Sequence, residues 1–194
     1  MVIAPGETLS FNEAVGPRTG RQGFRRAPVI DAGELVPGMG GGVCQVASTL
    51  HGAALRAGLE IVEAQPHSRP AGYMPLGLDT AVSWPALDLA IANRYDFPVM
   101  VSTLAHDGEL VVEIVGASSG PDIEISRRVL TRIGFREETV VDPTLAPGER
   151  RVTQNGIRGA HIEVTRTTRE GDETTIESHV VRYPPTPRIV RVGA

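Results

Sequence analysis

The sequence contains no lysine, and all 19 of its basic residues are arginine. Without lysine, the chain cannot use a Schiff base, a phosphate-loop lysine or a serine–lysine dyad. The arginines are scattered among 23 acidic residues, and the net charge is −4. Because binding to a phosphate backbone requires a basic stripe, the sequence predicts no nucleic-acid partner.

Long apolar runs are also missing. No window of the 194 residues holds the roughly 20 consecutive apolar residues that a membrane span requires. The first six residues, Met-Val-Ile-Ala-Pro-Gly, lead directly into a turn and do not resemble a secretory signal. We therefore expect no membrane span within this chain, and an export signal or anchor upstream of its first residue.

The sequence has a single cysteine, Cys44, so no internal disulfide can form. No Cys/His spacing suits a structural zinc site, and phosphate-loop and dinucleotide fingerprints are absent. We therefore predict neither a metal nor a cofactor. Aromatic residues are sparse, whereas 22 Gly and 15 Pro indicate many turns and short strands.

Only one stretch, about 43–57, has a convincing helical period, with apolar residues recurring at three- and four-residue steps. Short strands are expected at 27–32, 59–63, 81–84, 87–92, 99–104 and 110–115, and later at 123–126 and 139–141. A long hairpin is expected from 161–167 and 174–183. These patterns predict an α+β fold. A β-rich catalytic-type domain over 1–118 is followed by a small all-β module over 119–194, which we interpret as a binding or spacer module.

Cys44 follows three glycines and falls in the first turn of the predicted helix. Unpaired N–H groups and the positive end of the helix dipole meet there and favour thiolate over thiol. Gly42 allows a close approach, and the amides of Cys44 and Gln45 are suited to hold an oxyanion. The alternative is a small apolar residue that packs the start of the helix, and the spacing alone favours neither.

A thiolate nucleophile needs a base and a group that orients the base. His67 lies in a loop between two prolines that can fold back over the helix start, although it is also compatible with a surface loop. Asp79 either orients that imidazole or caps a turn. His51 lies about 10 Å further along the helix than Cys44, so we interpret it as a partly exposed structural residue.

Several other residues have two interpretations. Arg18 and Arg69 suit a substrate carboxylate, because arginine binds carboxylates in a bidentate fork, but isolated arginines are commonly surface ion-pair partners. Ser68 lies beside His67 in the same loop. Tyr73 and Trp84 either line a groove or pack at its rim.

Four ordered blocks in the first 105 residues resemble VanW-like domains: Pro5 to Asn12, Val15 to Thr19, Gly40 to Val46 and Pro66 to Pro70. The C-terminal region resembles the five-glycine adhesion domain that often accompanies them. This likeness rests on Gly156 to Gly159, Val164 to Arg166, the turn at Gly171, Tyr183-Pro184 and Ile189 to Gly193.

The resemblance implies a bacterial, extracytoplasmic protein of the cell wall or the membrane-anchored cell surface. The family is named after glycopeptide (vancomycin) resistance clusters, and some members are L,D-transpeptidases that use a cysteine thioester. By this likeness, Cys44 is the nucleophile, and His67 and Asp79 complete the catalytic set. The partners implied are peptidoglycan stem peptides and wall glycans. The chain departs from the family at Ala47, at His51 and in the order Asp79-Thr80-Ala81.

The favoured hypothesis is therefore an L,D-transpeptidase-type acyltransferase that releases terminal D-Ala from a stem peptide. A thiol cell-wall peptidase is a second hypothesis, in which water instead of an amine resolves the thioester. A third is a non-catalytic wall- or carbohydrate-binding protein in which Cys44 only packs.

Overall fold

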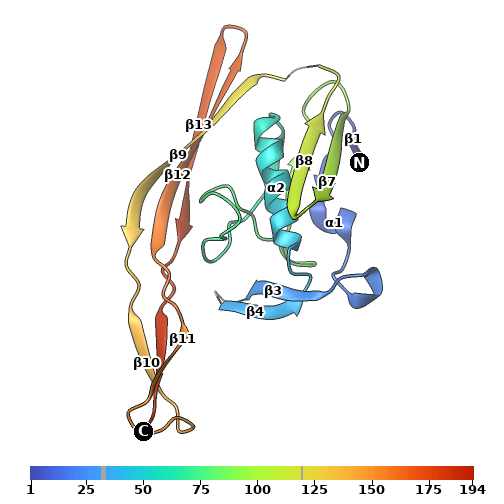
Figure 1. Ribbon diagram of the computed structural model, residues 1–194. Coiled ribbons are helices and arrows are strands. Elements are labelled where there is room, and N and C mark those ends of the chain that lie inside the picture. Colours follow the sequence, from blue (N-terminus) through green and yellow to red (C-terminus); the bar gives the residue numbers. More distant parts are fainter. Residues whose placement is uncertain (32–33, 119) are drawn as a thin grey trace.

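The computed structural model describes residues 1–31, 34–118 and 120–194. An N-terminal β-rich part with one long helix is followed by an elongated β part that runs along that helix (Figure 1). The helices are α1 (Phe11–Val15), the short 3-10 helix η1 (Gly20–Gln22) and α2 (Val43–Arg56). The strands are β1 (Val2–Ile3), β2 (Thr8–Ser10), β3 (Arg26–Asp31), β4 (Glu34–Met39), β5 (Glu60–Glu63), β6 (Ala90–Ala92), β7 (Val99–His106), β8 (Glu109–Val115), β9 (Asp122–Ile133), β10 (Glu137–Val141), β11 (Arg150–Gln154), β12 (Gly159–Glu170), β13 (Glu173–Tyr183) and β14 (Arg188–Val192).

In the N-terminal part, the described residues form three small antiparallel sheets. Their strand orders are β1-β7-β8, β2-β6-β5 and the hairpin β3-β4. The hairpin β7-β8 turns at Asp107 and Gly108, as the sequence predicts, and both residues have positive φ. Helix α2 packs against β5 and β8, so the sheets and the helix share one core.

Helix α2 carries two adjacent buried stripes at helical spacing. Ala47, Leu50 and Ala54 pack into the N-terminal core, with Ile3, Phe11, Leu59, Val82, Leu89, Ile91, Val99 and Val101. Leu55, on the next stripe, packs into a second core with Leu78, Ala160, Ile162, Val164, Val181 and Tyr183. The same helix therefore ties the N-terminal part to the sheet of the C-terminal part.

Residues 120–194 form six strands and no helix. One sheet has the order β13-β12-β9 and is antiparallel throughout. The other has the order β10-β14-β11, in which β10 and β14 run parallel and β11 is antiparallel. The long hairpin β12-β13 lies beside α2, and β10 and β11 lie at the far end of the molecule (Figure 1). This arrangement confirms the predicted α+β class, with one main helix and an all-β C-terminal region.

The sequence prediction fails at several elements. Residues 81–84 do not form a strand. Their backbone groups bind a loop carbonyl and the Cys44 sulfur, and Ser83 forms an isolated β-bridge with Leu87. The strand expected at 87–92 is shortened to β6. Strand β4 was not among the predicted strands, and it contains Pro37 and Gly38, which a two-stranded hairpin tolerates. Strands β1, β2, β11 and β14 and helix α1 were also not predicted.

Two further predictions need comment. His51, expected to be partly exposed, is 8% exposed and belongs to the buried stripe of α2. Ala32, the last residue of the strand predicted at 27–32, lies outside the described residues, and the rest of that prediction corresponds to β3. Within the described residues, none of the helices is long and apolar enough to cross a membrane.

Candidate active site

Cys44 lies in the first turn of α2, where the chain changes from a glycine loop to a helix. Gly42 caps the helix with φ 92°, a left-handed conformation that glycine adopts without strain. The N–H of Val43 bonds to Gly40 at 3.2 Å and that of Val46 to Gly42 at 3.1 Å. The intervening amides, those of Cys44 and Gln45, are first-turn groups with no carbonyl one turn earlier in the helix. Their N–H groups are therefore directed toward the N-terminal end of the helix, beside the thiol.

The loop before the helix packs directly on β3. A Cβ added to Gly41 would lie 2.4 Å from the Cβ of Ala27 and 2.9 Å from the carbonyl oxygen of Pro28. No side chain fits at that distance, so Gly41 lets the hairpin β3-β4 support the start of α2. The position of Cys44 therefore depends on a backbone contact that only glycine permits.

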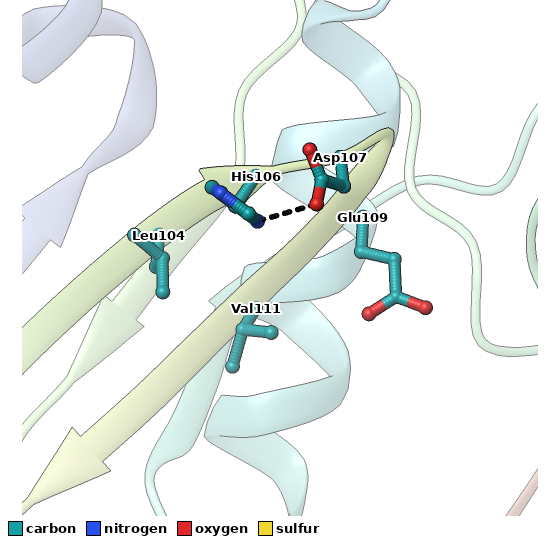
Figure 2. A pocket seen from close by; sticks show the side chains of 5 residues that line it. All are labelled: Leu104, His106, Asp107, Glu109 and Val111. Carbon is teal, nitrogen blue, oxygen red and sulfur yellow. Dashed lines mark ion pairs between the residues drawn. The ribbon is translucent and has the colours of Figure 1, made fainter.

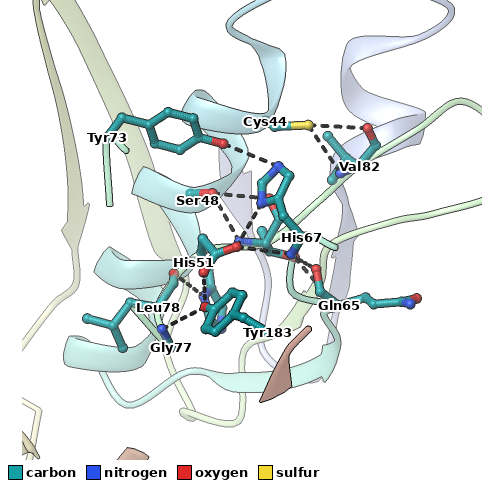
Figure 3. A network of polar contacts seen from close by, with 12 residues as sticks. Cys44, Ser48, His51, Gln65, His67, Tyr73, Gly77, Leu78, Val82 and Tyr183 are labelled. Carbon is teal, nitrogen blue, oxygen red and sulfur yellow. Dashed lines mark hydrogen bonds and ion pairs between the residues drawn. The ribbon is translucent and has the colours of Figure 1, made fainter. Parts of the chain in front are cut away.

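His67, which Figure 3 shows among the residues around Cys44, forms a buried pair with Asp79. The ring Nδ1 of His67 lies 2.7 Å from Asp79 Oδ2, and the backbone N–H of His67 donates to the same oxygen at 3.0 Å. Their side chains are 4% and 1% exposed. Because a carboxylate only accepts, Nδ1 carries a proton, and Nε2 is directed away from Asp79.

The thiol of Cys44 is half-buried and lies against the backbone of Val82, with Sγ 3.5 Å from both its nitrogen and its oxygen. Burial opposes ionisation, but the hydrogen bond with His67, the N–H of Val82 and the charges of His67 and Arg18 together lower the pKa of the Cys44 thiol. The same thiol and Asp79 outweigh burial at His67 and raise its pKa to about 9. These shifts favour a thiolate–imidazolium pair.

Three side chains on one stripe of α2 bind the backbone of alternate residues in the segment 78–82. The pairs are Cys44 with Val82, Ser48 with Thr80 (3.0 Å from its nitrogen, 3.1 Å to its oxygen) and His51 with Leu78 (3.0 Å). The helix rises about 10 Å from Cys44 to His51, and four residues of extended chain span at most about 13 Å, so the segment 78–82 can follow this stripe of the helix. Asp79 lies between two of these anchors, and its backbone is therefore held on both sides.

Tyr73 approaches His67 from the solvent side. Its hydroxyl lies 3.3 Å from Nε2, and the residue is 39% exposed. The rings of the two residues meet edge to face, with centroids 6.2 Å apart. Burial of the hydroxyl raises the pKa of Tyr73 to about 12, so the phenol stays protonated. It is thus a neutral group beside the nitrogen that faces the thiol.

Arg18 brings a positive charge to the same region. Its guanidinium donates to the Gly16 carbonyl at 2.7 Å and to Asn12 Oδ1 at 2.6 Å. It also lies over the rings of Phe11 and Trp84, at 5.7 and 6.0 Å from their centroids. These contacts hold the guanidinium in place, close enough to Cys44 for its charge to lower the pKa of the thiol.

Comparison with known proteins shows the family to which the chain belongs. Residues 1–115 match the family described as "VanW like protein". The chain belongs to this VanW-like family. Residues 125–194 match the G5 domain, and G5 domains occur in surface and secreted proteins of bacteria. The VanW-like domain and the following G5 domain agree with the resemblance stated from the sequence.

Among relatives, the VanW-like chain is 43% identical over 113 residues to "Uncharacterized protein YoaR" of Bacillus subtilis. That alignment covers 58% of this chain and 37% of the relative, so the chain spans little more than a third of the relative's length. Among solved structures, the "IgA1 Protease G5 domain structure" is similar, with 32% identity and a TM-score of 0.27. The match covers 38% of this chain and 92% of that one.

Within the VanW-like domain, the structure brings together Cys44, His67 and Asp79, with Tyr73 against the ring and Arg18 near the thiol. Gly42 and Gln45 flank Cys44 and are exposed. Ser68, next to His67, is exposed, and Arg69 is half-buried. Gly42 and Gln45 belong to the start of α2, and Ser68 and Arg69 adjoin His67 along the chain.

Sequence reasoning missed several participants. Ser48 and Thr80 are buried polar residues whose pairing no local pattern indicates. Tyr183 was expected at the end of the strand 174–183 and in the adhesion-domain likeness, with no role in the catalytic site. In the structure, its hydroxyl donates to Asp79 Oδ1. The sequence offers no signal for this contact, because the two residues are 104 positions apart.

A depression at the tip of the hairpin β7-β8 lies outside this network (Figure 2). It is lined by Leu104, His106, Asp107, Glu109 and Val111. The ion pair between His106 and Asp107, at 3.1 Å, joins side chains that are 75% and 85% exposed. Exposed pairs of this kind contribute little energy, and the depression lacks a buried polar group. It does not share the chemistry of the Cys44 site.

Proposed function

We propose that this VanW-like chain is a cysteine acyltransferase of the L,D-transpeptidase type, acting on peptidoglycan stem peptides outside the cytoplasm. The observation that carries the proposal is the buried His67–Asp79 hydrogen bond beside a half-buried thiol at a helix N-terminus, where His67 lowers the pKa of that thiol. A nucleophile, a base and an orienting carboxylate in this order are the requirements of acyl transfer.

In the first step, the Cys44 thiolate attacks the carbonyl carbon of the L,D-amide before the terminal D-alanine. A C–S bond forms, and the carbonyl oxygen becomes an oxyanion that the amides of Cys44 and Gln45 stabilise. When the C–N bond breaks, the His67 imidazolium gives its proton to the departing amine. D-Alanine leaves, and the stem peptide remains attached to Cys44 as a thioester.

In the second step, the side-chain amine of another stem peptide attacks the thioester carbonyl. His67, now neutral, takes the proton from this amine as the new C–N bond forms. The C–S bond breaks and the thiolate returns. No external oxidant or energy source is needed, because one amide is exchanged for another.

Arg18 and Arg69 are proposed to bind substrate carboxylates, and Arg18 is the better supported of the two. Its two hydrogen bonds leave guanidinium N–H groups available, and its charge already acts on Cys44. Gly42, Ser68 and Tyr73 complete the proposed substrate surface. The G5 domain suggests a role in cell-surface binding, and we propose that it holds wall polymer near the site.

Incubation with a purified stem tetrapeptide tests the proposal by intact-mass spectrometry. The wild-type chain should gain the mass of the tetrapeptide less D-alanine, and Cys44→Ala should gain nothing. A stem peptide with an acceptor amine should then discharge the adduct as a cross-linked dimer. Discharge to the free tripeptide alone would identify a thiol peptidase. Absence of both adduct and D-alanine would leave a non-catalytic wall-binding protein.

A further inference from the structure

The side chain of Tyr183, at the end of β13, brings the C-terminal module into direct contact with Asp79 of the proposed active site. Tyr183 is completely buried and lies in the core that also contains Leu55 of α2 and Leu78. Its hydroxyl contacts two groups on the loop that leads to Asp79. In Figure 3 its ring lies beside Gly77 and Leu78, beneath His51 and His67.

The direction of each hydrogen bond at this hydroxyl follows from its partners. The N–H of Gly77 lies 2.8 Å from the Tyr183 oxygen and can only donate. The hydroxyl therefore accepts from Gly77, and its own proton goes to Asp79 Oδ1. Burial and the neighbouring carboxylate raise the pKa of Tyr183 above its ordinary value, so the donor keeps its proton.

Asp79 is thereby fixed at both oxygens. Oδ2 accepts from the ring and the backbone of His67, and Oδ1 accepts from Tyr183. Burial would raise the pKa of Asp79, but the hydrogen bonds from His67 and Tyr183 lower it. Without a donor at Oδ1, a carboxyl group can rotate and exchange its oxygens. With it, Oδ2 stays directed at His67.

The loop carrying Asp79 is also packed against the C-terminal sheet. A Cβ at Gly77, whose φ is 91°, would lie 2.6 Å from Val164 and 3.3 Å from Ile162 on β12. Arg127 on β9 donates to the Leu76 carbonyl at 3.3 Å. The loop is therefore held between α2 on one side and the sheet β9-β12-β13 on the other.

We propose that Tyr183 is a positioning residue for the Cys44 site, so that the C-terminal module completes the VanW-like active site instead of only tethering it. This inference rests on the proposed function. Tyr183 acts through Asp79 on His67, and through His67 on the charge of the thiol. Its loss should change the rate of the chemical step and leave substrate binding almost unaltered.

Tyr183→Phe removes only the hydroxyl, and Val181→Ala is the matched control. Val181 lies in the same core, two residues away on β13, and its side chain has no group that can hydrogen-bond to Asp79. The rate of Cys44 alkylation by iodoacetamide is measured against pH in the full chain, with thermal unfolding measured in parallel. In Tyr183→Phe, His67 should hold its proton less firmly, so the midpoint of the alkylation profile should move to higher pH. Val181→Ala should lower the melting temperature and leave that midpoint in place.

With a stem tetrapeptide, Tyr183→Phe should lower kcat by about 10- to 100-fold, as expected for one lost hydrogen bond to a charged group, with KM nearly unchanged. Should that variant fail to fold, 3-fluorotyrosine at position 183 keeps the shape and donates a more acidic proton. Because the geometry is kept, the stronger donor should draw charge from Asp79, so that His67 holds its proton less firmly and the alkylation midpoint moves to higher pH. Wild-type midpoints in both variants would overturn the role of Tyr183.

Alkylation requires no substrate, so the two proposals fail separately. A shifted midpoint in Tyr183→Phe without any D-alanine release by the wild type would support the positioning role and reject the transpeptidase. Normal turnover by Tyr183→Phe would reject the positioning role and leave the transpeptidase intact. A wild-type thiol that alkylates like a free cysteine would overturn both.

Discussion

His67 Nδ1 lies 2.7 Å from Asp79 Oδ2, and both side chains are shielded from solvent. A charged hydrogen bond in such a setting is stronger than in water, and it fixes which ring nitrogen faces the thiol. The start of α2 carries a half-buried sulfur but no acid–base group. The His67–Asp79 pair provides that group, with the imidazole held in a defined orientation.

Replacing His67 by alanine should lower the rate of D-alanine release by about 10²–10⁴-fold, because a positioned acid–base group typically contributes that much. His51→Ala is the comparison variant: it removes a buried histidine that anchors the segment 78–82 but exchanges no proton with substrate, so its rate should fall much less than that of His67→Ala. His51 is neutral because burial lowers its pKa, and it binds the Leu78 carbonyl. This variant should lose about 1–3 kcal/mol of unfolding free energy, since a buried carbonyl loses its partner. Rates and melting curves that changed equally in both variants would contradict the assignment.

The rate of transfer should depend on pH with two limbs. The thiolate is required, so activity falls as pH drops through the Cys44 pKa, which lies below that of a free thiol. The imidazolium is required to protonate the amine, so activity also falls as pH rises through about 9, the pKa of His67. A profile of kcat/KM from pH 5 to 10 checks this. A rate that kept rising above the upper limb would mean that His67 donates no proton.

Asp79→Asn should lower kcat and move the upper limb below pH 9, because the charge that raises the His67 pKa is removed. The amide also has only one oxygen to accept from both His67 and Tyr183. Glu60→Gln is the control for loss of one negative charge, since Glu60 pairs with Arg94 at the exposed surface. Its pH profile should coincide with that of the wild type, and a matching shift in both would indicate a general field effect.

Gly41→Ala should destabilise the fold and slow alkylation of Cys44. The added methyl would lie 2.4 Å from Ala27, and backbone atoms of β3 cannot move aside cheaply. Gly20→Ala is the matched control, because a Cβ there meets nothing within 4 Å. It should change unfolding free energy by less than about 0.5 kcal/mol. Equal melting temperatures for the two variants would show that the helix start tolerates displacement.

Local patterns in the sequence correctly predicted the elements that depend on residues close together in the chain. The period of α2, the glycines before it and the hairpins β7-β8 and β12-β13 follow from side-chain repeats of 3.6 and 2 and from turn residues. The prediction failed for the segment 81–84, whose backbone binds the Cys44 sulfur and a loop carbonyl. No periodicity distinguishes such partners from a neighbouring strand.

The sequence by itself determined the nature of the helix start, the choice of Cys44 and the loop that carries His67. All of these depend on residues close together in the chain. Only the tertiary structure decided that His51 is buried, that the stripe of α2 anchors the segment around Asp79, and that Tyr183 reaches this carboxylate. Such contacts arise when two sheets pack on one helix. Hydrophobic burial drives that packing, but it is not directional, so the sequence does not show which distant side chains will meet.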